Sequence, residues 1–529
     1  MSRKIKAILA LVLVAALMCT LFAACAKQQT STTPSDTSTT TNQEKTDTPA
    51  KTEEPAKSEE PEQTSEPEQP EEIVEINYAF YDFSNTCSEH MDRIAAAVNA
   101  ITEKEIGVHV NFQPCVPGEW AAKVGTAIAG GEVIDVMQLI PPIIPLGTLY
   151  ASNQIVDITD LLPEYAPNAY EIMKNYFGNL TVDGKIMGLP AYRNLCSNGY
   201  LLMRKDILEE LDLLDKAENM TTWSEYEQIL QAVTDKYRDQ GIYANTNGIA
   251  NLMNGYYGDN FSDIQTPWLT DGLGVAGLMK DGQVHFIQGS DEYKAMAILM
   301  KDWRDKGYIY PDSLYTTVIQ DDLFKQGVAF SGPQGAEYGV ATTKSAAFGM
   351  EVIATQVRKG FISGAGWGVV FPTTGEETEA ALRFMDLCFT SPEVMNLLTR
   401  GEEGTDYNLV DGQISFVEGP HYFQTATFFG NELISTPLLG NGADFYDKVK
   451  AIMNEADVSP YMGFSFNVSA LDNYVSQLSV VMDQYKLMMN NGGYNEEDFQ
   501  DFLTKLEAAG VNDYIAELQS QVDAWEATH

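Results

Sequence analysis

Hydrophobic and polar positions follow two different periods from residue 73 onward. Residues 73–80 alternate in the manner of a half-buried strand, and apolar residues then recur at helical spacing over 91–101. A strand over 108–112, a helix from Pro117 to the Gly pair at 130–131, and a strand over 133–137 follow. This order predicts a parallel sheet wrapped by helices, with ligands bound outside the carboxyl ends of the strands.

The next part of the chain contains an interrupted pair of strands. An Asp-Gly turn at 183–184 predicts a hairpin, Pro190 ends a short apolar run, and 199–203 is typical of a new strand. A segment that stops as one strand and resumes as another suits a crossover between two lobes. Later patterns predict a capped helix from Thr221, an amphipathic helix over 293–303 and two C-terminal helices separated by Gly510, the first capped by Asn495.

Length and charge narrow the class of protein. A chain of 529 residues is too long for one core and predicts two or more domains. The formal charge of −42, from 75 acidic and 33 basic residues, repels phosphate backbones and argues against nucleic-acid binding.

The N-terminal residues are expected to be a targeting signal and not part of the folded domain. Three basic residues precede an apolar run over 7–21 that is too short to prefer a membrane span. The sequence Leu21-Phe22-Ala23-Ala24-Cys25 resembles a bacterial lipobox, with Phe where Leu is usual. We therefore expect a lipoprotein signal peptide over 1–24 and a lipidated Cys25; the alternative is secretion with cleavage after Ala24. Residues 25–72, rich in Ser, Thr, Pro and Glu, cannot build a core and are expected to be a disordered tether.

Four motifs together resemble the extracellular solute-binding proteins of ABC importers, of the sugar-binding family 1 type. The stretch 183–190 with Arg204-Lys205-Asp206 is similar to the family's first crossing between lobes, and 322–330 to its F-x-x-G-x-A strand. The motif Gly401-Glu402-Glu403-Gly404-Thr405-Asp406-Tyr407 and the tail at 505–525 resemble a lipoprotein subgroup with a C-terminal domain of unknown function. The resemblance covers roughly residues 73–529.

The resemblance implies an α/β, periplasmic-binding-protein-like two-lobe (Venus flytrap) fold of type II. Lobe 1 is expected over 73–190 and 366–400, and lobe 2 over 191–365 and 401–529, including a C-terminal helical region over 460–529. Crossing segments near 190–194, 364–368 and 400–404 would form the hinge, because Gly and Pro crowd them.

The resemblance also implies a monomeric substrate-binding protein. It would capture an extracellular solute, first of all a carbohydrate or oligosaccharide, at the extracellular face of the bacterial cell membrane, where a lipid anchor holds it. It would then deliver the solute to the permease subunits of an ABC transporter.

Sugar binding calls for aromatic platforms and for short polar or bidentate side chains. The segment 331–334, expected to follow a strand, and several other loops are expected to face the cleft. A single Trp or Tyr is more often core packing than a platform, so these side chains are proposed as a set. The candidate ligand-binding residues are Tyr81, Asp82, Asn85, Tyr192, Arg193, Asn194, Trp268, Gln334, Trp367, Phe429 and Asn431.

Other chemistry finds little support. The five histidines are far apart in the sequence, so neither a metal site nor a catalytic residue is proposed. The G-x-G-x-x-G at 272–277 follows a loop and opens no βαβ unit, so no nucleotide cofactor is expected. Cys87 and Cys115 fall near one sheet end, either as a disulfide or as two thiols.

Two alternatives remain at the level of sequence. A surface-anchored glycoside-active enzyme would need two carboxylates at catalytic separation, for which the pair Glu402-Glu403 is a candidate. A peptide-binding or adhesion lipoprotein would show a long groove with exposed strand edges.

Overall fold

Two sheets, each with its own hydrophobic core, organise the part of the chain that the structure describes. The structure is a computed structural model that describes residues 73–85, 87–141, 143–248, 258–315 and 320–528. All of these residues belong to one compact unit of the chain, residues 67–529. The predicted signal peptide, Cys25 and the whole of the predicted tether thus lie outside the described residues.

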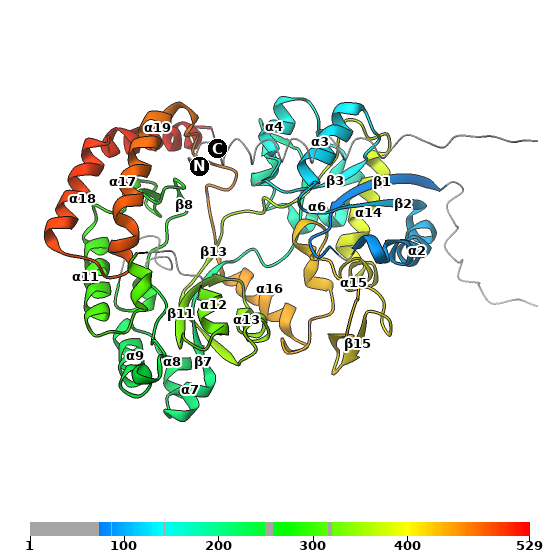
Figure 1. Cartoon of the computed structure of the whole chain (residues 1–529). Helices are drawn as coiled ribbons and strands as arrows, with labels where there is room; N and C mark the ends of the chain where they lie inside the picture. Colours follow the sequence, from blue (N-terminus) through cyan, green and yellow to red (C-terminus); the bar gives the residue numbers. More distant parts are fainter. Residues whose placement is uncertain (1–72, 86, 142, 249–257, 316–319, 529) are drawn as a thin grey trace, which may run out of the picture. The chain divides into compact units, whose positions relative to one another are not determined.

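The first sheet has five strands in the order β2-β1-β3-β14-β6, of which Figure 1 labels β1, β2 and β3. Strand β1 pairs in parallel with β2 and β3, whereas β14 runs antiparallel to β3 and β6. The parallel arrangement predicted for the first three strands is confirmed, although the third begins at Val136 instead of at 133. The bounds are β1 (Val74–Tyr81), β2 (Val108–Cys115), β3 (Val136–Leu139), β6 (Leu189–Pro190) and β14 (Gly368–Val370).

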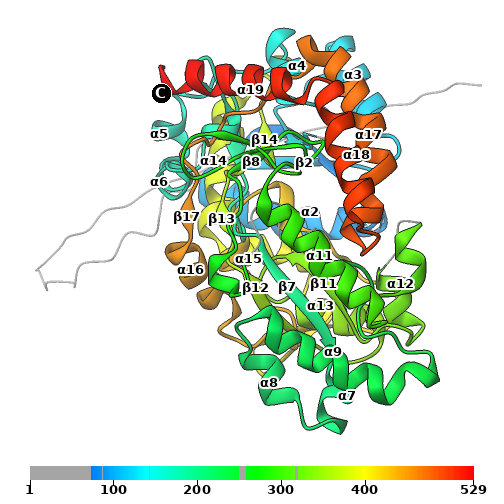
Figure 2. The ribbon, with the colours of Figure 1, turned by 90° about the vertical axis from the view of Figure 1, so that its left-hand side faces the viewer.

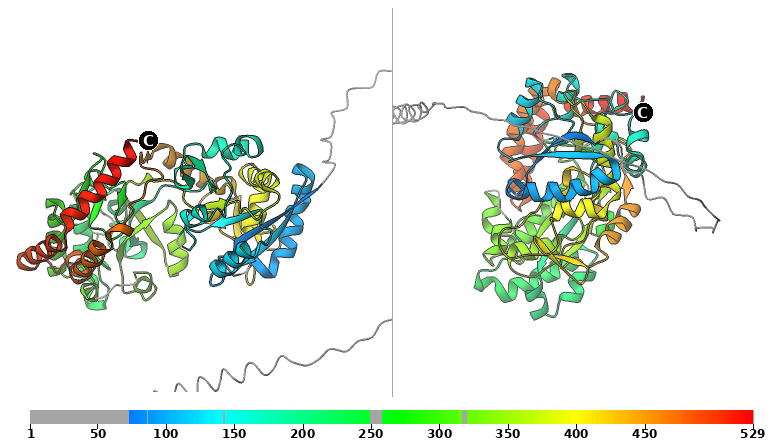
Figure 3. Two further views of the ribbon diagram at one scale, coloured as in Figure 1. Left: turned by 90° about the horizontal axis from the view of Figure 1, so that it is seen from above. Right: turned by 90° about the vertical axis from the view of Figure 1, so that its right-hand side faces the viewer.

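Alternation along β1 explains why both faces of this sheet are covered. Ile76, Tyr78 and Phe80 belong to one core cluster, and Ala79 belongs to another on the opposite face, because successive strand residues point to opposite sides. Helix α2 lies along β1 and β2 in the right-hand view of Figure 3. The helices of the first face are α2 (Cys87–Ile106), α5 (Leu162–Tyr165), α6 (Pro167–Met173), α14 (Thr378–Thr390) and α15 (Pro392–Arg400); those of the second are α3 (Trp120–Gly130) and α4 (Leu146–Ala151).

The second sheet is antiparallel, in the order β11-β7-β12. Its strands are β7 (Asn198–Arg204), β11 (Ser331–Ala336) and β12 (Val352–Arg358). Leu201 and Met203 of the central strand enter one core cluster, whereas Tyr200 and Leu202 enter the cluster on the other face.

The position of β11 corrects one prediction. Residues 331–334 lie within the strand and pair with β7, instead of following the strand. The preceding segment is not part of it, because helix α12 (Gln320–Lys325) ends before Gly327, whose φ is 72°. Residues 328–330 then pair with Tyr243. The residues that emerge from the strand are therefore Glu337 and Tyr338.

Helix α9 (Trp223–Tyr237) begins as its sequence predicts. The Thr222 hydroxyl accepts a hydrogen bond from the Glu225 amide at 3.1 Å, and the Glu225 carboxylate accepts one from the Thr222 amide at 3.2 Å. This reciprocal capping box satisfies two amides that the helix itself leaves without partners. Trp223, the first residue of α9, is buried in the core.

The C-terminal helices complete the second core. Helices α17 (Asp472–Asn490), α18 (Glu496–Ala508) and α19 (Val511–Glu526) pack with α9 and α11 (Asp291–Asp305) in the cluster that contains Leu201 (Figure 2). Asn495 caps α18 by accepting from the Asp498 amide at 2.8 Å, and Gly510 separates α18 from α19 with a φ of 86°. Both predicted helices are confirmed.

Residues 401–431 join the first core, although they were expected in lobe 2. Arg93 of α2 donates to the Asp406 carboxylate at 2.8 and 2.9 Å and also pairs with Glu402. Tyr422 and Phe429 are buried in the same cluster as β1. This bidentate ion pair, with the apolar residues behind it, holds 402–429 against the first sheet. The segment 400–404 is consequently no crossing.

The chain passes to the second core later in the sequence. Helix α16 (Phe445–Glu455) packs in a small cluster with Cys196 and Ile362. Strand β17 (Asp457–Val458) then pairs in parallel with β13 (Phe361–Ile362). The crossings therefore run near 190–198, 361–368 and 456–463, whereas residues 436–439 still bond to Asn396 and Ile414 beside the first core.

Cysteine chemistry is also settled within the described residues. Cys87, Cys115, Cys196 and Cys388 are all free and buried, so Cys87 and Cys115 are two thiols. Burial is the main reason that the pKa of the Cys87 thiol is raised, which keeps it protonated and unreactive.

Candidate ligand-binding cavities

A cavity of about 420 Å³, called here the first cavity, lies between two of the predicted crossing segments, those near 190–194 and 364–368. Its walls come from the loop after β3, from the chain between β6 and β7, and from the chain between β13 and β14. This volume falls within the range of roughly 300–1,000 Å³ that is typical of ligand sites. The lining residues are Pro141, Asn179, Ala191, Arg193, Asn194, Leu195, Ser197, Glu337, Ser363, Gly364, Ala365, Gly366 and Trp367.

An aromatic row stands behind one wall of the first cavity. The ring of Trp367, which lines the cavity and is half-buried, lies 5.2 Å from that of Phe428. Phe428 lies 5.9 Å from Tyr81, and Tyr81 lies 5.8 Å from the buried ring of Trp120. Phe83 contacts Tyr81 at 6.2 Å yet is 56% exposed. Packing on one side leaves the outer rings rigid and ready to stack against the apolar face of a ligand.

The polar wall of the first cavity is an ion pair. Arg193 donates to the carboxylate of Glu337. Burial raises the pKa of Glu337; the charge and hydrogen bond of Arg193 oppose this shift, and the charge of Glu432 adds to it. The carboxylate is therefore held in place by Arg193 while a second acid lies near it.

A second cavity of about 430 Å³ shares Asn194 and Glu337 with the first. Two of its polar side chains are almost fully buried: Arg400 is 3% exposed and Asn194 is 5% exposed. The other lining residues are Ala336, Tyr338, Gly339, Val340, Thr343, Glu432, Leu433, Leu438, Asn441, Phe445, Tyr446 and Val449. The rings of Tyr338 and Phe445 stack at 5.6 Å with 27° between their planes.

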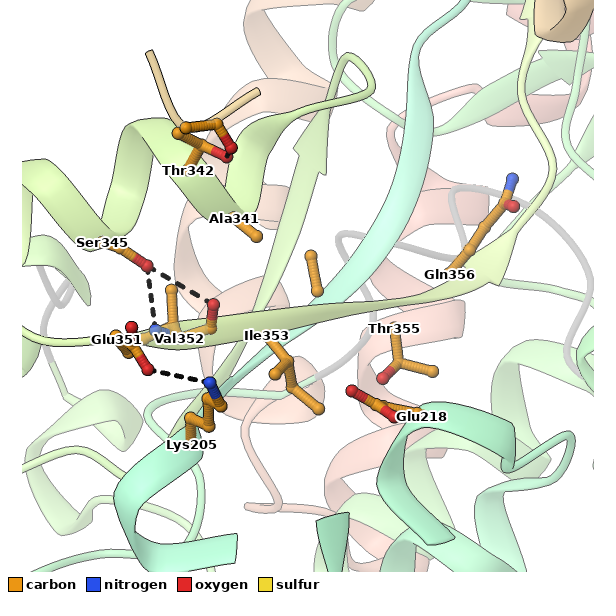
Figure 4. Close-up of a pocket in the computed structure, with 12 residues that line it drawn as sticks. Lys205, Glu218, Ala341, Thr342, Ser345, Glu351, Val352, Ile353, Thr355 and Gln356 are labelled. Carbon is orange, nitrogen blue, oxygen red and sulfur yellow. Dashed lines mark hydrogen bonds and ion pairs between the residues drawn. The ribbon is translucent and has the colours of Figure 1, made fainter. Parts of the chain in front are cut away.

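A third hollow, of about 600 Å³, runs along the edge strand β12 and is called the β12 groove (Figure 4). Lys205 reaches the Glu351 carboxylate at 2.9 Å, and Ser345 accepts from the Val352 amide at 2.9 Å. None of the side chains that line this groove is aromatic. The first and second cavities consequently suit a sugar better than the β12 groove does.

Three of the predicted ligand-binding residues come together in the first cavity: Arg193, Asn194 and Trp367. Tyr81 belongs to the aromatic row behind it. Tyr192 is half-buried on the neighbouring backbone, where its ring stacks against Tyr176 at 6.3 Å.

Three other predicted residues have structural roles. Asp82 is fully buried and accepts from the Cys87 amide at 3.0 Å, which caps the start of α2. Asn431 is 5% exposed; it accepts from the Leu433 amide and donates to the Phe389 carbonyl. Phe429 is 2% exposed in the first core. With their polar atoms bonded or their rings buried, these side chains have nothing left to offer a ligand.

The remaining three predicted residues line neither cavity. Asn85 is exposed in the loop after β1 with a φ of 58°. The ring of Trp268 packs edge-on against Phe361 at 4.7 Å, with the Lys280 ammonium 5.0 Å from its centre. Gln334 points along β11 and donates to the carbonyl of the next residue at 2.9 Å.

Several cavity residues were missed by the sequence reasoning. Glu337 and Tyr338 follow β11, and a correct strand register would have found them. The adjacent aromatics Phe445 and Tyr446 at the start of α16 were a visible signal. No signal in the sequence marked Arg400 and Glu432, because only the tertiary fold brings them to the cavity.

The sites considered for other chemistry have ordinary roles. Glu402 is tied to Arg93, and the G-x-G-x-x-G at 272–277 runs into strand β9 (Ala276–Leu278) instead of a helix. In the described part of the chain, no group of three or more His, Cys, Asp or Glu side chains is arranged to hold a metal ion. No helix among the described residues combines the length and apolar character needed to cross a membrane.

Sequence comparisons agree with this architecture. The sequence model of the bacterial extracellular solute-binding protein family matches residues 96–402, more than half of the chain. A domain of unknown function, DUF3502, matches residues 460–527. A carbohydrate ABC transporter substrate-binding protein of Streptococcus pneumoniae is 21% identical over 458 residues, which cover 82% of this chain and 88% of that protein. The polygalacturonan/rhamnogalacturonan-binding protein YtcQ of Bacillus subtilis is 28% identical over 263 residues, 46% of this chain and 49% of that protein.

Solved structures share the fold. The N-glycan transport solute binding protein NgtS of Streptococcus pneumoniae superimposes with a TM-score of 0.70 at 19% identity, covering 86% of this chain and 99% of that one. An extracellular solute-binding protein of Bifidobacterium longum subsp. infantis superimposes with a TM-score of 0.57 at 15% identity, covering 85% of this chain and 98% of that one. The expected α/β solute-binding fold is confirmed, and so is the expectation of a binding protein in place of a glycosidase. The chain belongs to the family of bacterial extracellular solute-binding proteins.

Proposed function

We propose that this protein captures an extracellular oligosaccharide in the first cavity and delivers it to the permease of an ABC importer. The observation that carries the proposal is the composition of that cavity. Trp367, backed by Phe428, offers an aromatic face, while Arg193, Glu337 and Asn194 offer hydrogen-bonding groups beside it. Pyranose rings have apolar faces edged by hydroxyls, which this combination matches. The relatives named for carbohydrate transport, polygalacturonan/rhamnogalacturonan binding and N-glycan transport support a saccharide as the ligand, and they include both acidic and neutral saccharides.

We further propose that the protein is held at the membrane surface by lipid on Cys25 and acts as a monomer. The motif that ends in Cys25 supports the anchor, and the tether of residues 26–72 is long enough to keep the folded part clear of the bilayer. Closure about the crossing segments would trap the sugar and present the loaded form to the permease.

The experiment is a thermal-shift screen of sugars, oligosaccharides and peptides, followed by calorimetry on variants. A ligand bound only by the folded protein raises its Tm. Trp367→Ala and Arg193→Ala should each weaken binding of the best oligosaccharide by about tenfold or more, corresponding to 1–3 kcal/mol. Tyr315→Ala, which removes an 81% exposed ring that lines neither cavity, is the control. Wild-type affinity in both cavity variants would refute the site, and a shift only with peptides would refute the ligand class.

A further inference from the structure

The second cavity contains hydrogen-bonding groups that the protein leaves without partners. The Arg400 Nε–H, the Asn194 Nδ2 amide and the Asn441 Oδ1 are all buried and unpaired. A buried polar group without a partner costs stability, so an unmet donor beside an open cavity points to an external acceptor. A ligand that can both accept and donate hydrogen bonds could therefore satisfy two donors and one acceptor on residues that line this cavity.

The charges in this cavity are already balanced. Arg400 lies 3.8 Å from the Glu432 carboxylate, and Arg193 is paired with Glu337. Burial raises the pKa of Glu337, and the charge of Glu432, which lines the same cavity, raises it further. Neither cation is left free to neutralise an incoming anion.

We propose that an uncharged oligosaccharide spans both cavities, with one sugar residue in the second, and that Glu337 and Glu432 exclude acidic sugars. The inference rests on the proposed function and narrows its substrate class to neutral glycans. Asn194 and Glu337 line both cavities, so the saccharide would pass beside them from one cavity to the other.

The chemistry of a neutral sugar fits each wall. A hydroxyl can accept from Arg400 or Asn194 and donate to a carboxylate at the same time, and the stacked rings of Tyr338 and Phe445 offer a surface for the apolar ring face. A uronate carboxylate beside Glu432 would instead lose its hydration without finding an unpaired cation, because Arg400 is already paired with Glu432 and Arg193 with Glu337. Burying an anion without a free counter-ion costs several kcal/mol, which weakens binding on the order of a hundredfold.

The first test compares matched ligands by calorimetry on the full mature chain. The panel contains neutral tetrasaccharides of mannose, glucose and galactose, together with tetragalacturonate and its methyl ester, which has the same skeleton without charge. At least one neutral member should bind, and tetragalacturonate should bind no better than about a hundredth as tightly. Tetragalacturonate binding as tightly as its ester or the best neutral sugar would overturn this inference and leave the proposed function standing. Binding of no member of the panel would overturn both.

The second test changes the two carboxylates. Glu337→Gln and Glu432→Gln should each weaken the neutral ligand by roughly tenfold, because a charged acceptor is lost. The same variants should narrow the gap between tetragalacturonate and its ester. Glu351→Gln, which removes the ion-paired carboxylate of the β12 groove, is the matched control and should change neither. Unchanged affinities in Glu337→Gln, the more exposed of the two sites, would overturn the inference even if Glu432→Gln fails to fold.

Discussion

Replacing Asp406 should show how firmly residues 401–431 are held to the first core. Its side chain is 1% exposed and accepts four hydrogen bonds: two from Arg93 at 2.8 and 2.9 Å, and one each from the Glu402 and Tyr422 amides at 2.8 Å. Each orphaned amide costs about 1 kcal/mol, and the lost ion pair costs about 1–2 kcal/mol more. The last figure is discounted because the Arg93 side chain is 31% exposed and regains water. Asp406→Ala should therefore destabilise the protein by about 3–4 kcal/mol.

At low pH the stabilising contribution of the Asp406 charge should disappear. Burial opposes ionisation of Asp406, but the hydrogen bonds from Arg93 and from the two amides lower its pKa below the ordinary value. A carboxyl whose pKa is lower in the folded state contributes stability above its unfolded pKa, near 4, and loses it as pH falls through the folded pKa. Wild type and Asp406→Asn should differ at neutral pH and converge on acidification.

Urea unfolding followed by tryptophan fluorescence measures both effects. Asp411→Asn, in the exposed turn of the hairpin formed by β15 (Tyr407–Val410) and β16 (Gln413–Phe416), removes a carboxylate without touching the ion pair and is the control. If Asp406→Ala lies within about 0.5 kcal/mol of wild type at neutral pH, the network is not what fixes 401–431.

Three further predictions concern the anchor, a close backbone contact and the hinge. Cys25→Ala should release the protein from bacterial membranes, as fractionation and blotting would show, and undiminished membrane retention would rule out the lipid anchor. Gly463→Ala should lower stability by several kcal/mol, because its Cβ would lie 2.5 Å from the Gly178 carbonyl oxygen at a φ of 91°. Gly412→Ala, at a φ of 73° with no atom near the new Cβ, measures the cost of the positive φ alone. An equal loss of stability in the two variants would refute the steric argument. Saturating oligosaccharide should lower the radius of gyration in small-angle scattering without altering the far-UV dichroism, whereas no fall would argue for a rigid protein.

Local patterns in the sequence predicted much of the secondary structure, because local physics decides it. The capping box at Thr222 and the Asn495 cap occur where their spacing places them, and the Asp183-Gly184 turn has the positive φ values that its residues favour. Alternation along β1 likewise predicted a strand with two different faces.

Positions that depend on long-range contacts were harder to predict. The segment after Gly401 follows a family motif, but only the fold shows that Asp406 reaches back to Arg93 on α2. Polar residues near helix starts look alike whether they cap or bind, which is why Asp82 and Asn431 were taken for ligand contacts. Strand ends are hard to place to within a few residues, so Gln334 was predicted to follow the strand, whereas Glu337 does.

Hydrogen–deuterium exchange with and without the best neutral oligosaccharide tests the central claim most directly. If the sugar occupies the two cavities, backbone amides over 191–197, 336–340 and 363–367 should gain protection, while those of β12 and of the C-terminal helices should not. Protection confined to 352–356 along the β12 groove, or no protection at saturating sugar, would contradict the account.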